Sequence, residues 1–150
     1  MVPYNCNGVK VPIVKGWTMA LNPREVVERL IGGISTESWD QLSQLYAEDA
    51  VVEHPYAVDG RRRTEGREVL HSRFTGARER LFKVTAHNLV VWQTDDPEVV
   101  VAEYDYHVDV PKTGERFETA NILVVRVRDG LIVHSRDFHD HHAIAKAVAA

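Results

Sequence analysis

The chain has 150 residues, of which 44% are hydrophobic and 27% charged, a balance typical of a soluble globular protein with one domain. Its net charge is −4 with histidine neutral and its pI is about 6.0, which argues against a nucleic-acid-binding protein because such proteins carry a basic excess. A single cysteine, Cys6, excludes an internal disulfide and a zinc module built on several cysteines. The apolar runs are too short to span a membrane, and the N-terminus lacks the apolar stretch of a secretion signal. We therefore expect a cytoplasmic protein.

The N-terminal segment differs in character from the rest of the chain. Residues 1–22 show no sustained periodicity and contain two prolines and two glycines. We expect an irregular arm, followed by a single domain over residues 23–150. The arm can be ordered only if Val11, Ile13 and Trp17 pack on the domain or on a neighbouring subunit.

Three segments in the first half of the domain have helical spacing. Asn22-Pro23 is a good helix start, with Asn as the cap and Pro at the first position, and Gly32-Gly33 is the expected end. A second, short helix follows, and a third is expected from Gly66 to about Leu81. The apolar positions expected to face inward are Val26, Val27, Leu30 and Ile31, then Trp39, Leu42, Leu45 and Tyr46, then Val69, Leu70, Phe74 and Leu81.

Strand patterns follow. Ala50-Val51-Val52 begins one strand, which Pro55 limits to an edge or an end of a sheet. The second half of the chain is rich in β-formers, with turns between the strands and an Asp129-Gly130 hairpin signal. The expected strands cover residues 82–93, 98–110, 115–127 and 131–141. Helices followed by hairpin-linked strands predict an α+β fold. We expect three N-terminal helices on a curved, mostly antiparallel sheet, which together form a cone with a mouth.

This order of elements resembles the nuclear transport factor 2-like superfamily over about residues 23–145. The superfamily includes ketosteroid isomerases and SnoaL-type polyketide cyclases. The run Leu45–Pro55, LYAEDAVVEHP, is similar to one in the isomerases, whose catalytic Asp immediately precedes the Pro; His54 holds that position here. The isomerase's oxyanion tyrosine falls on Leu30 and its oxyanion Asp near Asn121, whose amide can still donate a hydrogen bond. Loss of one such donor typically costs about 100- to 1,000-fold in rate, which argues against efficient steroid isomerisation.

A second stretch is similar to the phenazine-biosynthesis A/B proteins of the same superfamily. It runs from Thr94-Asp95-Asp96-Pro97 through Glu103-x-Asp105-x-His107 to Arg136-Asp137-Phe138. The resemblance implies that Asp137 is the carboxylate of the last strand. It also implies roles for His71 in the third helix and for the Thr75 hydroxyl one turn later.

His54 and Asp137 are the candidate catalytic residues. An imidazole exchanges protons near neutral pH, although His54 is equally consistent with a rim histidine in an edge strand. Asp137 shares one side of its strand with His139, and a carboxylate on an apolar concave wall has a raised pKa. The alternative for Asp137 is a salt bridge to an arginine such as Arg126 or Arg128. The expected substrate-binding residues are Tyr104, Tyr106, Asn121, His71, Thr75, Phe74, Trp39 and His139.

Three polar groups have plainer interpretations. The run His139–His142 alternates between two faces of the expected strand, so we expect no metal site. Glu103, Asp105 and His107 face outward, where the resemblance implies a dimer interface and the alternative is a solvated face. Arg61-Arg62-Arg63 fits a solvated loop, with the alternative that it guides an anionic substrate to the mouth.

Two functions remain open from the sequence. The first is an enzyme without a cofactor, of isomerase, cyclase or dehydratase (lyase) type, acting on a small apolar cyclic or aromatic carbonyl compound in secondary metabolism. The second is a non-catalytic binding module or structural dimer of the same fold. An ionisable pair inside an apolar pocket would favour the enzyme. With either function we expect a homodimer.

Overall fold

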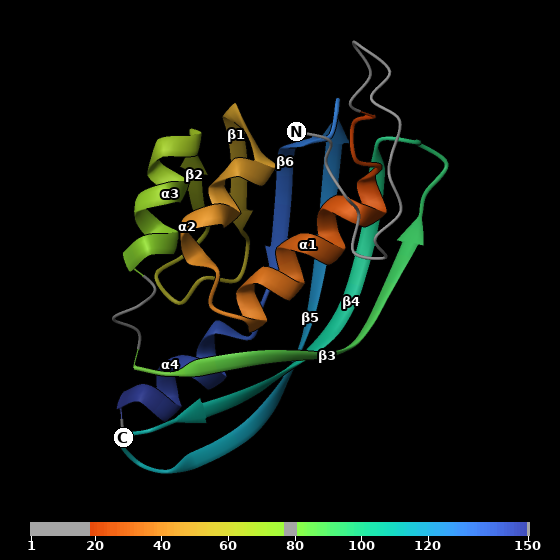
Figure 1. Ribbon diagram of the computed structural model, residues 1–150. Coiled ribbons are helices and arrows are strands. Elements are labelled where there is room, and N and C mark those ends of the chain that lie inside the picture. Colours follow the sequence, from red (N-terminus) through yellow and green to blue (C-terminus); the bar gives the residue numbers. More distant parts are fainter. Residues whose placement is uncertain (1–18, 77–80, 150) are drawn as a thin grey trace, which may run out of the picture.

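The computed structural model describes residues 19–76 and 81–149, which form an α+β fold (Figure 1). The first elements are α1 (Pro23–Ser35), α2 (Trp39–Leu42), the 3-10 turn η1 (Ser43–Leu45), β1 (Tyr46–His54), β2 (Arg62–Glu65) and α3 (Arg67–Gly76). They are followed by β3 (Lys83–Gln93), β4 (Val99–Val110), β5 (Glu115–Arg128), β6 (Leu131–Phe138) and α4 (His141–Ala149). The expected docking of Val11, Ile13 and Trp17 lies outside the described residues.

The six strands form one sheet in the order β2-β1-β6-β5-β4-β3. Only the β1–β6 pair is parallel; the other neighbours are antiparallel. Strands β3, β4 and β5 are long and bend around the concave side, which α1 crosses (Figure 1). A β-bulge at Asn88, where φ is +56°, interrupts the β3–β4 register and adds to that bend. The curved, mostly antiparallel sheet confirms the coarse fold prediction.

Helix α1 begins where the sequence predicts. The Asn22 side chain accepts a hydrogen bond from the Glu25 backbone N–H at 3.0 Å, and the Glu25 carboxylate accepts one from the Asn22 N–H at 2.9 Å, a complete capping box. The helix continues past the expected glycine end. A Cβ at Gly33 would lie 2.5 Å from the Leu42 side chain, so glycine here permits close packing rather than helix termination.

The three expected N-terminal helices differ in extent from the helices of the structure. The second helix is a single turn, because Tyr46 already starts β1 instead of closing a helical stripe. Helix α3 comes after β1 and β2, and its described part ends at Gly76. Leu70 is buried as expected, but Val69 is half exposed. The prediction that Val69 faces inward was therefore wrong. Leu81 is also exposed.

The C-terminal end differs most from the prediction. Strand β6 ends at Phe138, and α4 begins at His141. The Asp140 carboxylate accepts a hydrogen bond from the Ala143 N–H at 2.9 Å, and the alanine-rich residues that follow favour a helix. The strand alternation expected through His142 was therefore wrong. In the described residues, no helix is long and apolar enough to cross a membrane.

Candidate active site

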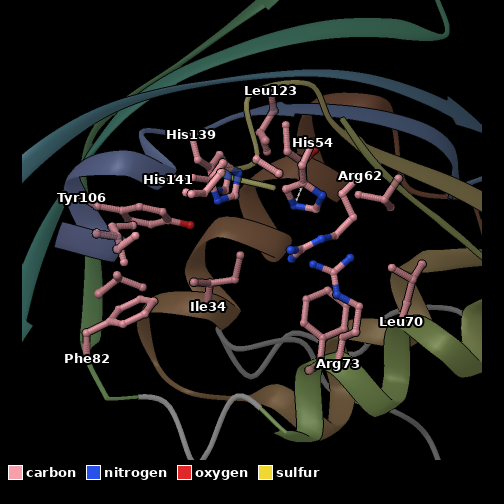
Figure 2. A pocket seen from close by; sticks show the side chains of 18 of the residues that line it. Ile34, His54, Arg62, Leu70, Arg73, Phe82, Tyr106, Leu123, His139 and His141 are labelled. Carbon is pink, nitrogen blue, oxygen red and sulfur yellow. Dashed lines mark ion pairs between the residues drawn. The ribbon is translucent and has the colours of Figure 1, made fainter. Parts of the chain in front are cut away.

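A cavity of about 430 Å³ lies on the concave side of the sheet (Figure 2). Most of its lining is apolar or aromatic, with a few polar groups that converge on it, which is the usual character of a small-molecule site. Four of the predicted aromatic residues line it: Trp39, Phe74, Tyr104 and Tyr106. Helix α4, which sequence patterns missed, contributes Ile144 and Val148.

His54 and Asp137 meet in this cavity. His54 is the last residue of β1 and Asp137 the second-last residue of β6, and these neighbouring strands are parallel. The pairing of Glu53 with Arg136 places the next residue of each strand side by side. His54 Nε2 lies 3.7 Å from Asp137 Oδ2, and their side chains are 10% and 14% exposed. Strand β1 lies between β2 and β6, so His54 is not a rim histidine of an edge strand.

The environment of Asp137 alters its protonation. Burial raises the pKa of its carboxyl to about 6, although the hydrogen bond from the Ser135 hydroxyl and the charge of Arg73 act in the opposite direction. At pH 7 most of the carboxyl is ionised, yet it can still be protonated. A group titrating this close to neutral pH is suited to proton transfer. The alternative salt bridges do not form, because Arg126 and Arg128 bind Glu98 instead.

Three buried tyrosines surround the pair. Burial and, to a smaller extent, the charge of Asp137 raise the pKa values of Tyr46 and Tyr104 well above the ordinary value. Both hydroxyls therefore stay protonated and remain hydrogen-bond donors at neutral pH. Tyr104 Oη lies 3.3 Å from His139 Nε2, and its ring packs edge-on against that of Tyr106 at 5.1 Å between centroids.

Two further histidines complete this side of the cavity. His139 follows β6 and His141 begins α4, and their rings stack at 5.7 Å between centroids. The His54 ring lies 5.4 Å from that of His141 and 6.0 Å from that of His139. Burial, followed by the charges of Arg62 and Arg73, lowers the pKa of His141. Within residues 19–76 and 81–149, no group of three or more His, Cys, Asp or Glu side chains is placed to hold a metal ion.

Three predicted binding residues lie away from the cavity lining. His71 Nδ1 is 3.0 Å from the Ser43 hydroxyl, and the Thr75 hydroxyl donates to the His71 carbonyl at 2.9 Å. Asn121 is buried on β5, but its amide nitrogen donates to the Thr119 carbonyl at 3.0 Å. None of these three residues is among those that line the cavity. Leu30, at the position of the isomerases' oxyanion tyrosine, does line the cavity but has no hydroxyl group. The hydroxyl donors of the cavity are therefore the tyrosines of β1 and β4.

Sequence patterns do not identify Tyr46, Arg73 and His141 as cavity residues. The helical spacing predicts Tyr46 in a helix, and the strand pattern predicts His141 in a strand. Arg73 carried a usable signal, because it lies three residues after Leu70 and therefore on the same face of the helix. An arginine among apolar neighbours on such a face indicates a cavity residue.

The fold and this cavity can now be compared with known proteins. The model of the SnoaL-like domain matches residues 27–135, which is most of the chain; the match includes His54 and ends two residues before Asp137. The chain belongs to the SnoaL-like domain family. Membership confirms the resemblance to the nuclear transport factor 2-like superfamily seen in the sequence.

Relatives of this SnoaL-like chain cover most of its length. It is 29% identical to the protein YesE of Bacillus subtilis over 112 residues, 74% of each chain. It is also 29% identical to a PhzA/B-like protein, PA3332, of Pseudomonas aeruginosa over 122 residues, 79% of this chain and 84% of the relative. A crystal structure of a Bacillus subtilis protein, provisionally named an isomerase, has a TM-score of 0.76 at 23% identity, covering 85% of this chain and 92% of the other. That last likeness shows the shared fold.

Proposed function

We propose that this SnoaL-like protein is a cofactor-independent acid–base enzyme acting on a small apolar cyclic or aromatic carbonyl compound. The observation that carries the proposal is the His54–Asp137 pair, which lies inside an apolar cavity with a carboxyl pKa of about 6. The name of the Bacillus structural neighbour favours isomerisation, and aldol-type cyclisation or dehydration next to a carbonyl group can begin with removal of the same kind of proton.

In the proposed mechanism, the Asp137 carboxylate removes a proton from the carbon next to the carbonyl group. The electron pair of the broken C–H bond moves to the carbonyl oxygen and forms an enolate. A protonated tyrosine, Tyr46 or Tyr104, donates a hydrogen bond to that oxygen, which matters most in a cavity that excludes water. The proton then returns to the same carbon or to another one, from Asp137 or through the neighbouring His54.

The non-catalytic binding module is the weaker candidate. Such a module needs an apolar cavity but has no use for a buried carboxylate, whose ionisation in an apolar site costs folding free energy. The presence of that carboxylate beside an imidazole supports the enzyme.

Proton abstraction can be tested before the natural substrate is known. We expect the protein to catalyse deuterium incorporation from D₂O next to the carbonyl of cyclohexanone or β-tetralone, followed by NMR. The rate should rise with pH through about 6, because the base must be ionised. Asp137→Asn keeps the shape of the side chain and should lower the exchange rate about 100-fold or more, the usual size of a lost general base.

His54→Gln is expected to lower the exchange rate less than Asp137→Asn, because His54 assists rather than removes the first proton. Glu103→Gln, on the opposite face of the sheet, is the matched control and should leave the rate unchanged. Exchange rates for Asp137→Asn and His54→Gln equal to that of the unmodified protein would overturn the proposed function.

A further inference from the structure

Two arginines reach the cavity from different elements. Arg62 extends from β2 and Arg73 from α3, and their guanidinium groups approach each other at the edge of the cavity (Figure 2). All three arginines of the 61–63 run are exposed, but only Arg62 is among the residues that line the cavity, and Arg63 pairs with Glu65 at 2.5 Å. Of the three consecutive arginines, the structure therefore singles out Arg62 as a cavity residue.

The two guanidinium groups differ in their partners. Arg62 is half exposed and donates to both oxygens of Asp59 at 2.8 and 2.9 Å, so its charge is balanced. Arg73 is partly buried and donates from Nη1 to the Thr64 hydroxyl at 2.6 Å, a neutral partner. Among the described residues, no carboxylate lies within salt-bridge distance of Arg73.

A permanently charged guanidinium in a partly buried site is costly unless an anion accompanies it. Burial and then the charge of Arg62 lower the pKa of Arg73, which reflects this cost, while the charge of Asp137 acts in the opposite direction. Asp137 faces the same cavity, but its carboxylate accepts from Ser135 and lies beside His54 rather than on Arg73. Within residues 19–76 and 81–149, Arg73 thus has no carboxylate as a direct partner, and its guanidinium lies at the cavity (Figure 2).

The surroundings specify what kind of anion fits. Phe74, Phe82 and Tyr106 line the cavity beyond the arginines, so most of the ligand must be apolar and flat. The fork of a guanidinium matches the two oxygens of a carboxylate. A volume of about 430 Å³ accommodates a molecule with one or two rings.

We propose that the ligand is a small cyclic or aromatic carboxylate, held by a salt bridge from its carboxylate group to Arg73 and by the positive field of Arg62. Its ring lies against the aromatic side chains, and its reacting carbon lies toward Asp137; this last placement rests on the proposed function. The substrate class then narrows from neutral carbonyl compounds to cyclic keto acids.

The test compares two probes of the same shape, benzoate and benzamide, by calorimetric or NMR titration of the full chain at constant ionic strength. We expect benzoate to bind at least about tenfold more tightly, because a charge-assisted bidentate pair is stronger than a neutral contact. Arg73→Gln should weaken benzoate binding about tenfold or more and leave benzamide binding within about twofold. Arg73→Lys should recover part of the loss, and Arg62→Gln should cause a smaller one, because Arg62 is already paired.

Arg29→Gln removes the same charge from the exposed surface of α1 and is the matched control for net charge. Equal affinities for benzoate and benzamide, or equal losses for both probes in Arg73→Gln, would overturn the carboxylate site. If Arg73→Gln does not fold, the comparison of the two probes on the unmodified protein and on Arg73→Lys decides the question in the same way. Asp137→Asn should still bind benzoate. Absence of deuterium exchange by the unmodified protein, together with a preference for benzoate over benzamide, would reject the proposed function alone. Exchange without a preference for benzoate would reject the carboxylate site alone.

Discussion

The two faces of strand β4 differ completely although they belong to the same twelve residues. On the concave face, Tyr104 and Tyr106 are buried beside Asp137 and line the cavity. On the convex face, Glu103 accepts a hydrogen bond from Trp92 Nε1 at 2.6 Å, Asp105 accepts one from Asn88, and His107 pairs with Glu118. Each outward polar group thus has a partner on its own sheet, in or near solvent.

This contrast explains why similar residue types have different consequences on the two sides. Carboxylates and imidazoles occur on both faces, but only burial in the cavity shifts the pKa of an aspartate toward neutrality. On the convex face, solvent screens the ion pairs, so they add little to stability. Chemistry is therefore expected from the concave face and association from the convex face.

The largest stability effect should separate two adjacent residues of β5. Leu123 faces the cavity side and is 2% exposed, whereas Ile122 on the convex face is 41% exposed. Leu123→Ala should lower the free energy of unfolding by about 2–5 kcal/mol, because it leaves a void that the core cannot fill. Ile122→Ala should lower it by less than about 1 kcal/mol. Urea denaturation of both variants measures the difference; equal losses would contradict the assignment of the two faces.

A smaller effect on the free energy of unfolding is expected at Asp137, where a substitution should stabilise the fold instead of destabilising it. Its folded pKa of about 6 lies above the ordinary 3.8, so ionisation of this carboxyl destabilises the fold once the pH rises through that interval. Asp137→Asn should therefore raise the free energy of unfolding by about 1–3 kcal/mol at pH 8. The gain should shrink as the pH falls and vanish near pH 4. Denaturation curves at several pH values test this, and a variant less stable than the parent at pH 8 would show that the carboxylate is stabilised in the fold.

The smallest effect on the folding of one chain is expected at the convex apolar patch, formed by Val90, Trp92 and Ile122. We propose that this patch joins two copies of the chain in a homodimer. Light scattering should give twice the chain mass of 17.0 kDa for the unmodified protein. Trp92→Arg should give the single mass with a change in stability below about 1 kcal/mol, because the new cation can pair with Glu103.

Val69→Arg introduces the same charge at an exposed apolar residue of α3 and serves as the control for that dimer. It should leave the doubled mass unchanged. A single-chain mass for the unmodified protein at micromolar concentration would reject the interface.

Much of the local structure followed from patterns in the sequence. The Asn22-Pro23 cap, the alternation of β4 and the Asp129-Gly130 hairpin were all predictable, because caps, period-two burial and tight turns depend on neighbouring residues. Helix α4 and strand β2 were not. Strand β2 has four residues and exists through its pairing with β1, and α4 begins in a histidine run that also fits a strand.

The candidate site likewise has residues that the sequence predicts and residues that only the tertiary structure reveals. The sequence by itself predicted His54 and Asp137 as the candidate proton-transfer residues and determined that Tyr104 and Tyr106 share one face of a strand. Only the tertiary structure decided that His71, Thr75 and Asn121 lie outside the cavity lining, and that Tyr46, Arg73 and His141 reach it. The reason is that residue spacing specifies which side of an element a side chain occupies, whereas the β1–β6 register and the packing of α3 and α4 specify which other side chains it meets.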